Sequence, residues 1–165
     1  TGIGWATADL VSEDLIRVMI GVIGALFAAN LLLPHTSHLA ARPIRKGPGP
    51  FWTAIAGFTS FVSHSGAPPW QVWVLPLKLP KMVFAGTTTI AFAIINALKL
   101  VPYYFLGQLS FENLQVAAVL MLPAALAVFA GLKLVRVIPE KTFFSLVTWA
   151  LLLISLKLIW DGALG

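Results

Sequence analysis

The sequence predicts an all-α integral membrane protein, and three observations support this fold class. Of its 165 residues, 59% are hydrophobic and 10% are charged, whereas soluble domains carry about 25% charged residues. Four apolar segments are long enough to cross a bilayer at about 1.5 Å per residue of helix. They are residues 15–33, 82–98, 114–132 and 142–160. The net charge of +5 comes largely from basic residues in the short loops between these segments, which favours a lipid bilayer, and not nucleic acid, as the partner.

The N-terminal part is predicted to contain one membrane helix followed by a polar linker. We expect residues 1–34 to be the end of a first structural repeat, namely its last transmembrane helix. Residues 35–50 form the only long polar stretch of the chain. Because positive residues accumulate on the inner side of membranes, Arg42, Arg45 and Lys46 predict that this linker is cytoplasmic.

No metal or other cofactor is expected. His35 and His38 are three positions apart and could share a metal ion, but no third ligand accompanies them, and a solvated loop is the commoner setting for such a pair. The sequence contains no cysteine, so it offers no thiolate ligand, disulfide or thiol nucleophile.

An interrupted apolar segment follows the linker. Its sequence, from residue 51 to residue 80, is FWTAIAGFTSFVSHSGAPPWQVWVLPLKLP. A helix over residues 51–64 reaches only about 21 Å, whereas the hydrocarbon core is about 30 Å thick. We therefore expect a hairpin over residues 51–79 that enters from the cytoplasm and returns there, which places Lys78 and Lys81 inside. Broken backbone in a membrane is tolerated where it is buried in protein or lines a wet cavity, so the break indicates a functional site.

The rest of the chain is predicted to complete a second repeat over residues 51–165. Three transmembrane helices are expected after the hairpin, at residues 82–99, 113–134 and 141–160. Aligning the sequence with itself pairs Glu13 with Glu140 and Asn30 with Lys157. We interpret this as two inverted-topology repeats, each a broken-helix hairpin plus three transmembrane helices, with the first repeat largely missing from this sequence.

The break supplies the first group of candidate substrate-binding residues. This group is Ser63, His64, Ser65 and Gly66. Gly66 permits a positive φ, and a half-helix beginning near Pro68 or Pro69 would direct its positive dipole end at an anion. Because proline has no N–H, side-chain hydroxyls and the imidazole would have to complete the site. The alternative for His64 is a capping residue that closes the helix end.

A second group lies on the segment that follows the hairpin. Gly86, Thr87 and Asn96 could allow close approach and polar contacts, although small residues also simply pack helices. Lys99 follows Asn96 by three positions and could attract a departing anion. The alternative for Lys99 is that it extends its amine to the membrane interface.

Several stretches resemble one known family. The pattern GFTSFVSHSGAPP, followed by LPLKLPK and VFAGTTTIAFAIINALKLVPYYFLGQ, is similar to the second half of the sulfite exporter TauE/SafE family. The run LVSEDLIRVMIGVIGALF is similar to the end of that family's first half. One departure is Ala67 after Gly66, where the family usually has a glycine pair.

The resemblance implies a multi-pass transporter of the bacterial inner membrane, built from two homologous halves. Its substrates would be small anions such as sulfite, sulfonates, thiosulfate or related organic acids. The sequence would be the C-terminal two-thirds of a member, and its first partner would be the missing N-terminal half of the same chain. Assembly into a homo-oligomer is compatible with this organisation.

Two other functions compete with transport. A non-transporting membrane scaffold or assembly factor would also be a helical membrane protein, but it would not need a broken helix. A membrane-embedded hydrolase would need a nucleophile and a base brought together from separate elements, whereas SHSG at residues 63–66 offers only adjacent residues. The sequence therefore predicts a transporter and not an enzyme.

Overall fold

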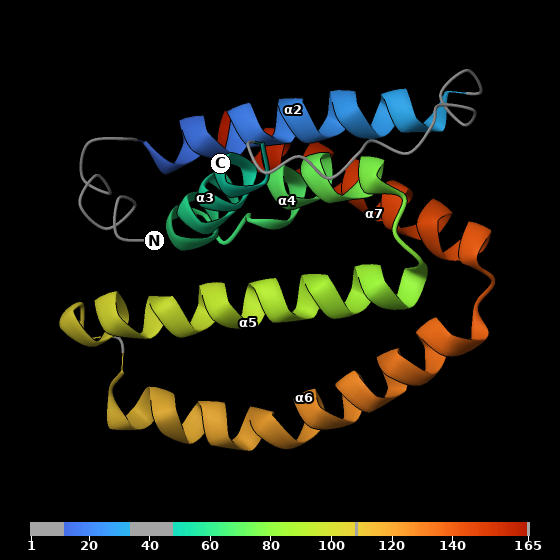
Figure 1. Ribbon diagram of the computed structural model, residues 1–165. Coiled ribbons are helices and arrows are strands. Elements are labelled where there is room, and N and C mark those ends of the chain that lie inside the picture. Colours follow the sequence, from blue (N-terminus) through green and yellow to red (C-terminus); the bar gives the residue numbers. More distant parts are fainter. Residues whose placement is uncertain (1–11, 34–47, 108, 165) are drawn as a thin grey trace. The chain divides into compact units, whose positions relative to one another are not determined.

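The computed structural model describes residues 12–33, 48–107 and 109–164, and in these ranges every regular element is helical. In chain order they are α2 (Glu13–Leu32), α3 (Pro48–Val62), α4 (Ala67–Val74), the short 3₁₀ helix η2 (Leu75–Leu77), α5 (Lys81–Phe105), α6 (Phe111–Val137) and α7 (Glu140–Leu164) (Figure 1). The prediction of an all-helical chain is confirmed for this part of the protein. His35, His38 and the basic residues of the linker lie outside the described residues.

Four of these helices are long and apolar enough to cross a membrane. They are α2, α5, α6 and α7, with 20, 25, 27 and 25 residues. Each begins or ends a few residues beyond its predicted apolar segment. Two of them begin at a serine cap. Ser12 Oγ accepts from the Leu15 N–H at 3.1 Å at the start of α2, and Ser110 Oγ accepts from the Asn113 N–H at 3.2 Å at the start of α6.

The chain divides into two compact units, which we describe separately. The first comprises residues 1–80 and 144–165, and the second comprises residues 81–143. The first unit therefore contains α2, the pair α3 and α4, and most of α7. The second contains α5, α6 and the first residues of α7.

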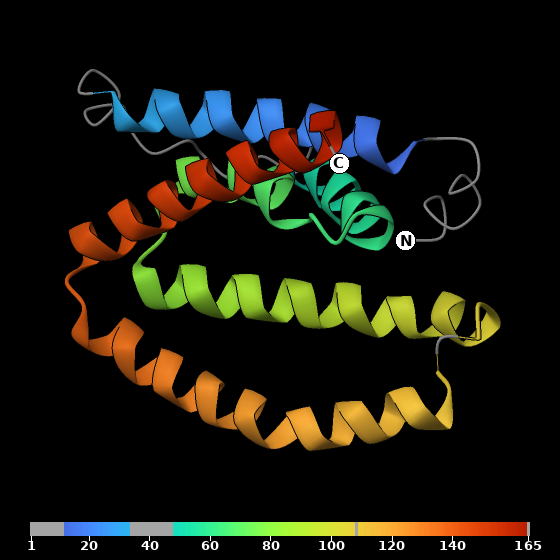
Figure 2. The same cartoon turned by 180° about the vertical axis from the view of Figure 1, so that it is seen from behind.

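In the first unit, α2 and α7 pack closely through glycines. A Cβ atom placed on Gly21 would lie 2.7 Å from the backbone oxygen of Ser155, and one on Gly162 would lie 2.6 Å from the backbone oxygen of Asp14. The pairing of residue 21 with 155 and of residue 14 with 162 shows that the two helices run in opposite directions, side by side in Figure 2. Within a membrane the hydrophobic effect does not drive helices together, so they associate through close packing, and small residues let their backbones approach in this way.

A small apolar core joins this helix pair to α3. It consists of Ile16, Ile20 and Leu158, with Phe58 and Val62 of α3 packed against it. α4 packs against both α2 and α3. The end of α3, where the chain breaks, is thus held against the α2–α7 pair.

In the second unit, α5 and α6 expose most of their apolar side chains. No residue of α6 is buried. Its exposed apolar surface suits contact with lipid. Both helices continue through an internal proline, Pro102 in α5 and Pro123 in α6. The end of α6 is capped by Lys81, whose Nζ donates to the carbonyl oxygens of Arg136 at 3.0 Å and Ile138 at 2.5 Å.

This cap leads to a first prediction. Lys81→Met keeps the apolar stem of the side chain but removes the ammonium, so the two carbonyls lose their donor. We expect the last turn of α6 to open more readily, by about 1 kcal/mol, the size of an ordinary hydrogen-bond contribution. Hydrogen exchange of the amides at residues 133–138 measures this directly. Lys141→Met, which changes an exposed lysine nearby, is the control, and equal exchange in both variants would contradict the capping role.

Candidate substrate site at the helix break

The interruption predicted from the sequence is present. α3 ends at Val62 and α4 begins at Ala67, and the residue with left-handed backbone between them is His64, with φ of 53°. Gly66 has φ of −78° and ψ of −17°, so the expectation that Gly66 supplies a positive φ is wrong. A left-handed residue just past a helix end turns the N–H that follows it back to a carbonyl of the last turn, as the Ser65 N–H does here to the Thr59 carbonyl. Histidine is among the non-glycine residues that adopt this conformation more often than most.

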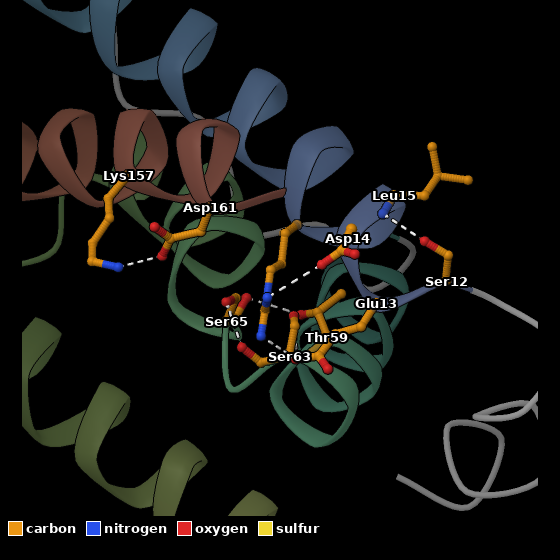
Figure 3. A network of polar contacts seen from close by, with 10 residues as sticks. Ser12, Glu13, Asp14, Leu15, Thr59, Ser63, Ser65, Lys157 and Asp161 are labelled. Carbon is orange, nitrogen blue, oxygen red and sulfur yellow. Dashed lines mark hydrogen bonds and ion pairs between the residues drawn. The ribbon is translucent and has the colours of Figure 1, made fainter. Parts of the chain in front are cut away.

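Thr59 organises the turn. Its carbonyl oxygen accepts from the N–H groups of Ser63 at 3.0 Å and Ser65 at 3.2 Å, and also from Ser63 Oγ at 3.1 Å. Its own hydroxyl donates to the carbonyl of Ser65 at 3.1 Å, and Ser65 Oγ donates to the carbonyl of Ser63 at 2.8 Å. Figure 3 shows these three side chains gathered at the end of α3. All three are buried. Thr59 was not among the residues predicted from the sequence, because its hydroxyl reaches the Ser65 carbonyl only once the turn has formed.

These bonds limit what the break can offer to an anion. The hydroxyl hydrogens of Ser63 and Ser65 are directed at main-chain carbonyls, so their oxygens remain mainly as acceptors. Pro68 and Pro69, in the first turn of α4, have no N–H, and the residue before the helix, Gly66, provides no side-chain cap. In contrast, the side chain of His64 is exposed.

The chain doubles back at this turn. α3 and α4 pack against each other, and a Cβ atom on Gly49, at the start of α3, would lie 2.9 Å from Cζ2 of Trp73, near the end of α4. The rings of Trp70 and Trp73 pack edge to face with centroids 5.3 Å apart. α3 and α4 thus lie against each other, while the hairpin over residues 51–79 and its path through a membrane stay predictions.

A polar pocket of about 450 Å³ adjoins the break. It is lined by Asp14, Arg17, Ser63, Leu158, Trp160, Asp161 and Leu164. These residues come from the start of α2, the end of α3 and the end of α7, all within the first unit. This pocket is not predictable from the sequence, because nothing in the spacing along the chain shows that the start of α2 and the end of α7 meet beside Ser63.

The charged residues that line the pocket take part in ion pairs, some with partners outside its lining. Arg17 pairs with Glu13 Oε1 at 2.5 Å and with Asp14 Oδ1 at 3.3 Å, and Lys157 pairs with Asp161. Spacings of three or four residues place these partners on one helical face, so the pairs themselves could have been read from the sequence. Exposed pairs of this kind contribute at most about 1 kcal/mol to stability.

The second group of candidate residues lies on α5, in the other unit. Asn96 and Gly86 are exposed, and a Cβ on Gly86 would meet no atom within 4 Å. Thr87 is half-buried and Lys99 is buried. The structure therefore brings Ser63, His64, Ser65 and Gly66 together in one turn, while the α5 group remains a prediction as part of the site.

No metal centre is evident in the described ranges. Among the residues placed by the structure, no three or more His, Asp or Glu side chains are grouped so that they could hold a metal ion.

An interrupted helix packed among helices of membrane-spanning length defines an integral membrane protein with the construction used by secondary transporters. The family model for the sulfite exporter TauE/SafE matches residues 1–158. The chain therefore belongs to the sulfite exporter TauE/SafE family, whose members are membrane transporters of sulfite-type anions and not enzymes. Neither the curated proteins nor the solved structures yielded a match.

Proposed function

We propose that this chain is part of a secondary transporter or exporter of small anions such as sulfite, sulfonates, thiosulfate or related organosulfur or organic acids. The observation that carries the proposal is the break at Ser63–Gly66, where a buried turn interrupts the α3–α4 pair beside a polar pocket. Family membership supports the class of substrate. A scaffold function would give no reason for an interrupted helix at this position.

In the proposed architecture, the substrate is held near the middle of the bacterial inner membrane. Residues 51–165 form one repeat, with the hairpin 51–79 entering from the cytoplasm. The first repeat, of opposite topology, comes from the N-terminal half of the same protein, and its last helix is contained in residues 1–34. Such inverted repeats place the substrate between two helix breaks and alternate its access to the two sides.

Within the break, the roles of the side chains differ. His64 contacts the anion, because its side chain is exposed at the turn. Ser63, Ser65 and Gly66 shape the turn and line it, since the serine hydroxyls are bonded to main-chain carbonyls. On α5, Gly86, Thr87, Asn96 and Lys99 line the path that the anion follows.

Transport by the full-length protein tests this function. In vesicles supplied with labelled sulfite, thiosulfate and a small sulfonate, His64→Ala is expected to insert normally and to lower transport roughly tenfold or more, the loss that follows from removing a hydrogen bond to a charged group. His64→Gly is the matched control for the backbone, because glycine adopts the left-handed conformation without strain.

Equal loss of transport in His64→Ala and His64→Gly would support a contact between the imidazole and the anion. Full transport by His64→Gly would make residue 64 a structural cap only. Absence of transport of all three anions by the unchanged protein would refute the proposed function itself.

A further inference from the structure

At the break, the exposed His64 is the side chain that can donate to an anion, and the adjoining pocket contains a second side chain with more donors. The hydroxyls of Ser63 and Ser65 donate to carbonyls, and the prolines at the start of α4 have no N–H. Arg17 lines the same pocket as Ser63. Its guanidinium carries five N–H donors in a planar fork and stays charged at every physiological pH.

We propose that Arg17 binds the transported anion in this pocket, on the part of its path nearest the start of α2 and the end of α7, with Ser63 connecting the pocket to the break. This inference rests on the proposed transport function and assigns its charged contact. The ligand class is a small oxyanion with two oxygens available to one guanidinium fork, such as sulfite or a short-chain sulfonate. Two parallel N–H···O bonds of this type are among the stronger polar contacts in proteins.

The remaining walls fit such a ligand. Leu158, Trp160 and Leu164 contribute apolar surface from the end of α7, which suits the short alkyl group of a sulfonate. The volume of about 450 Å³ lies within the range of about 300–1,000 Å³ typical of small-molecule sites. The pocket therefore has room for the anion together with some of its water.

In the structure, the guanidinium of Arg17 forms ion pairs with carboxylates of its own helix. Glu13 and Asp14 both pair with it, from about one turn away along the same helix. The charged side chains that line the pocket are Asp14, Asp161 and Arg17, and Glu13 and Lys157 pair with Arg17 and Asp161 from outside the lining. An incoming anion must therefore displace a carboxylate from Arg17, and the same carboxylates favour its release.

This exchange predicts effects of opposite sign at neighbouring positions. Arg17→Gln removes the fork and should weaken sulfite binding roughly tenfold or more. Glu13→Gln and Asp14→Asn remove a competitor but keep the shape of the side chain, so each should tighten sulfite binding several-fold. Lys133→Gln, on α6, is the control with the same change of net charge, because Lys133 is exposed and does not line the pocket; its effect should stay within about twofold.

The experiment measures sulfite and methanesulfonate binding to the purified full-length protein by tryptophan fluorescence, together with KM and kcat for transport in vesicles. Trp160 lines the pocket, so loss of the fluorescence change in Trp160→Phe assigns the signal to this site. A higher KM with unchanged kcat in Arg17→Gln, a lower dissociation constant in Glu13→Gln, and little change in Lys133→Gln would support the inference. Arg17→Lys, which keeps the charge but not the fork, should recover only part of the affinity.

Unchanged affinity in Arg17→Gln, in a variant that inserts and unfolds like the original protein, would overturn the inference and leave the proposed function intact. Equal weakening by Arg17→Gln and Lys133→Gln would also overturn it, because net charge alone would then explain the effect. Failure of the unchanged protein to bind or transport any of these anions would refute the proposed function instead.

Discussion

Gly21→Val is expected to separate α7 from α2 and to destabilise the protein strongly. A Cβ at this position lies 2.7 Å from the Ser155 carbonyl oxygen and 3.0 Å from the Ile159 N atom. Because these are backbone atoms, only a shift of a whole helix can relieve the overlap. Overpacking of this kind costs about 1–3 kcal/mol, which corresponds to an unfolding midpoint roughly 2–10 °C lower for a chain of this size.

Thermal unfolding in detergent provides the measurement, and Gly131→Val provides the control. Gly131 lies in the helix α6, and a Cβ placed there meets no atom within 4 Å. Valine at 131 therefore changes only local helix propensity, by a few tenths of a kcal/mol relative to glycine. If both variants unfold at the same temperature, the close contact between α2 and α7 is not present in the protein.

Thr59→Val is expected to disrupt the break and to abolish transport. Valine has nearly the same shape as threonine but cannot donate to the Ser65 carbonyl, which receives the Thr59 hydroxyl at 3.1 Å in the unchanged protein. A buried carbonyl left without a donor costs about 1–3 kcal/mol. Because Ser65 is bonded both through its N–H and through its carbonyl to Thr59, the turn loses one of the two bonds that close it.

Thr53→Val is the matched control on the same helix. The Thr53 hydroxyl donates at 2.8 Å to the carbonyl of Gly49, four residues earlier, and a carbonyl inside a helix keeps its main-chain donor when such a bond is lost. Unfolding midpoint and sulfite transport should change strongly in Thr59→Val and little in Thr53→Val. Transport at the original rate by Thr59→Val would show that the hydroxyl does not maintain the site.

Substitutions at Arg17 and Glu13 are expected to change anion affinity in opposite directions, and this separates binding from the stability effects described above. Variants at residues 21 and 59 are expected to act by displacing the elements that form the pocket. Arg17→Gln, in contrast, removes only exposed pairs within one helix, whose contribution to stability is small. A change in anion affinity without a change in unfolding midpoint is therefore the signature of the proposed binding role.

The helices themselves were predictable, because helix formation in a membrane is a local matter. Each spanning helix satisfies its backbone groups within its own segment, so the apolar runs that predicted α2, α5, α6 and α7 were sufficient. The same locality applies to the interruption between α3 and α4, since the prolines after Gly66 mark the start of a helix wherever the chain folds.

The geometry of the site was decided by contacts between distant residues or by competing local bonds. The left-handed residue is His64 and not Gly66, because the carbonyl of Thr59 collects the donors that close the helix end, and that choice does not follow from conformational preference alone. In contrast, the composition and the residue spacing of the sequence were sufficient to predict the membrane class, the helices and the break. Only tertiary packing decided that Arg17 and Ser63 share a pocket with the end of α7, because glycine-mediated approach of α2 and α7 sets which helix ends meet.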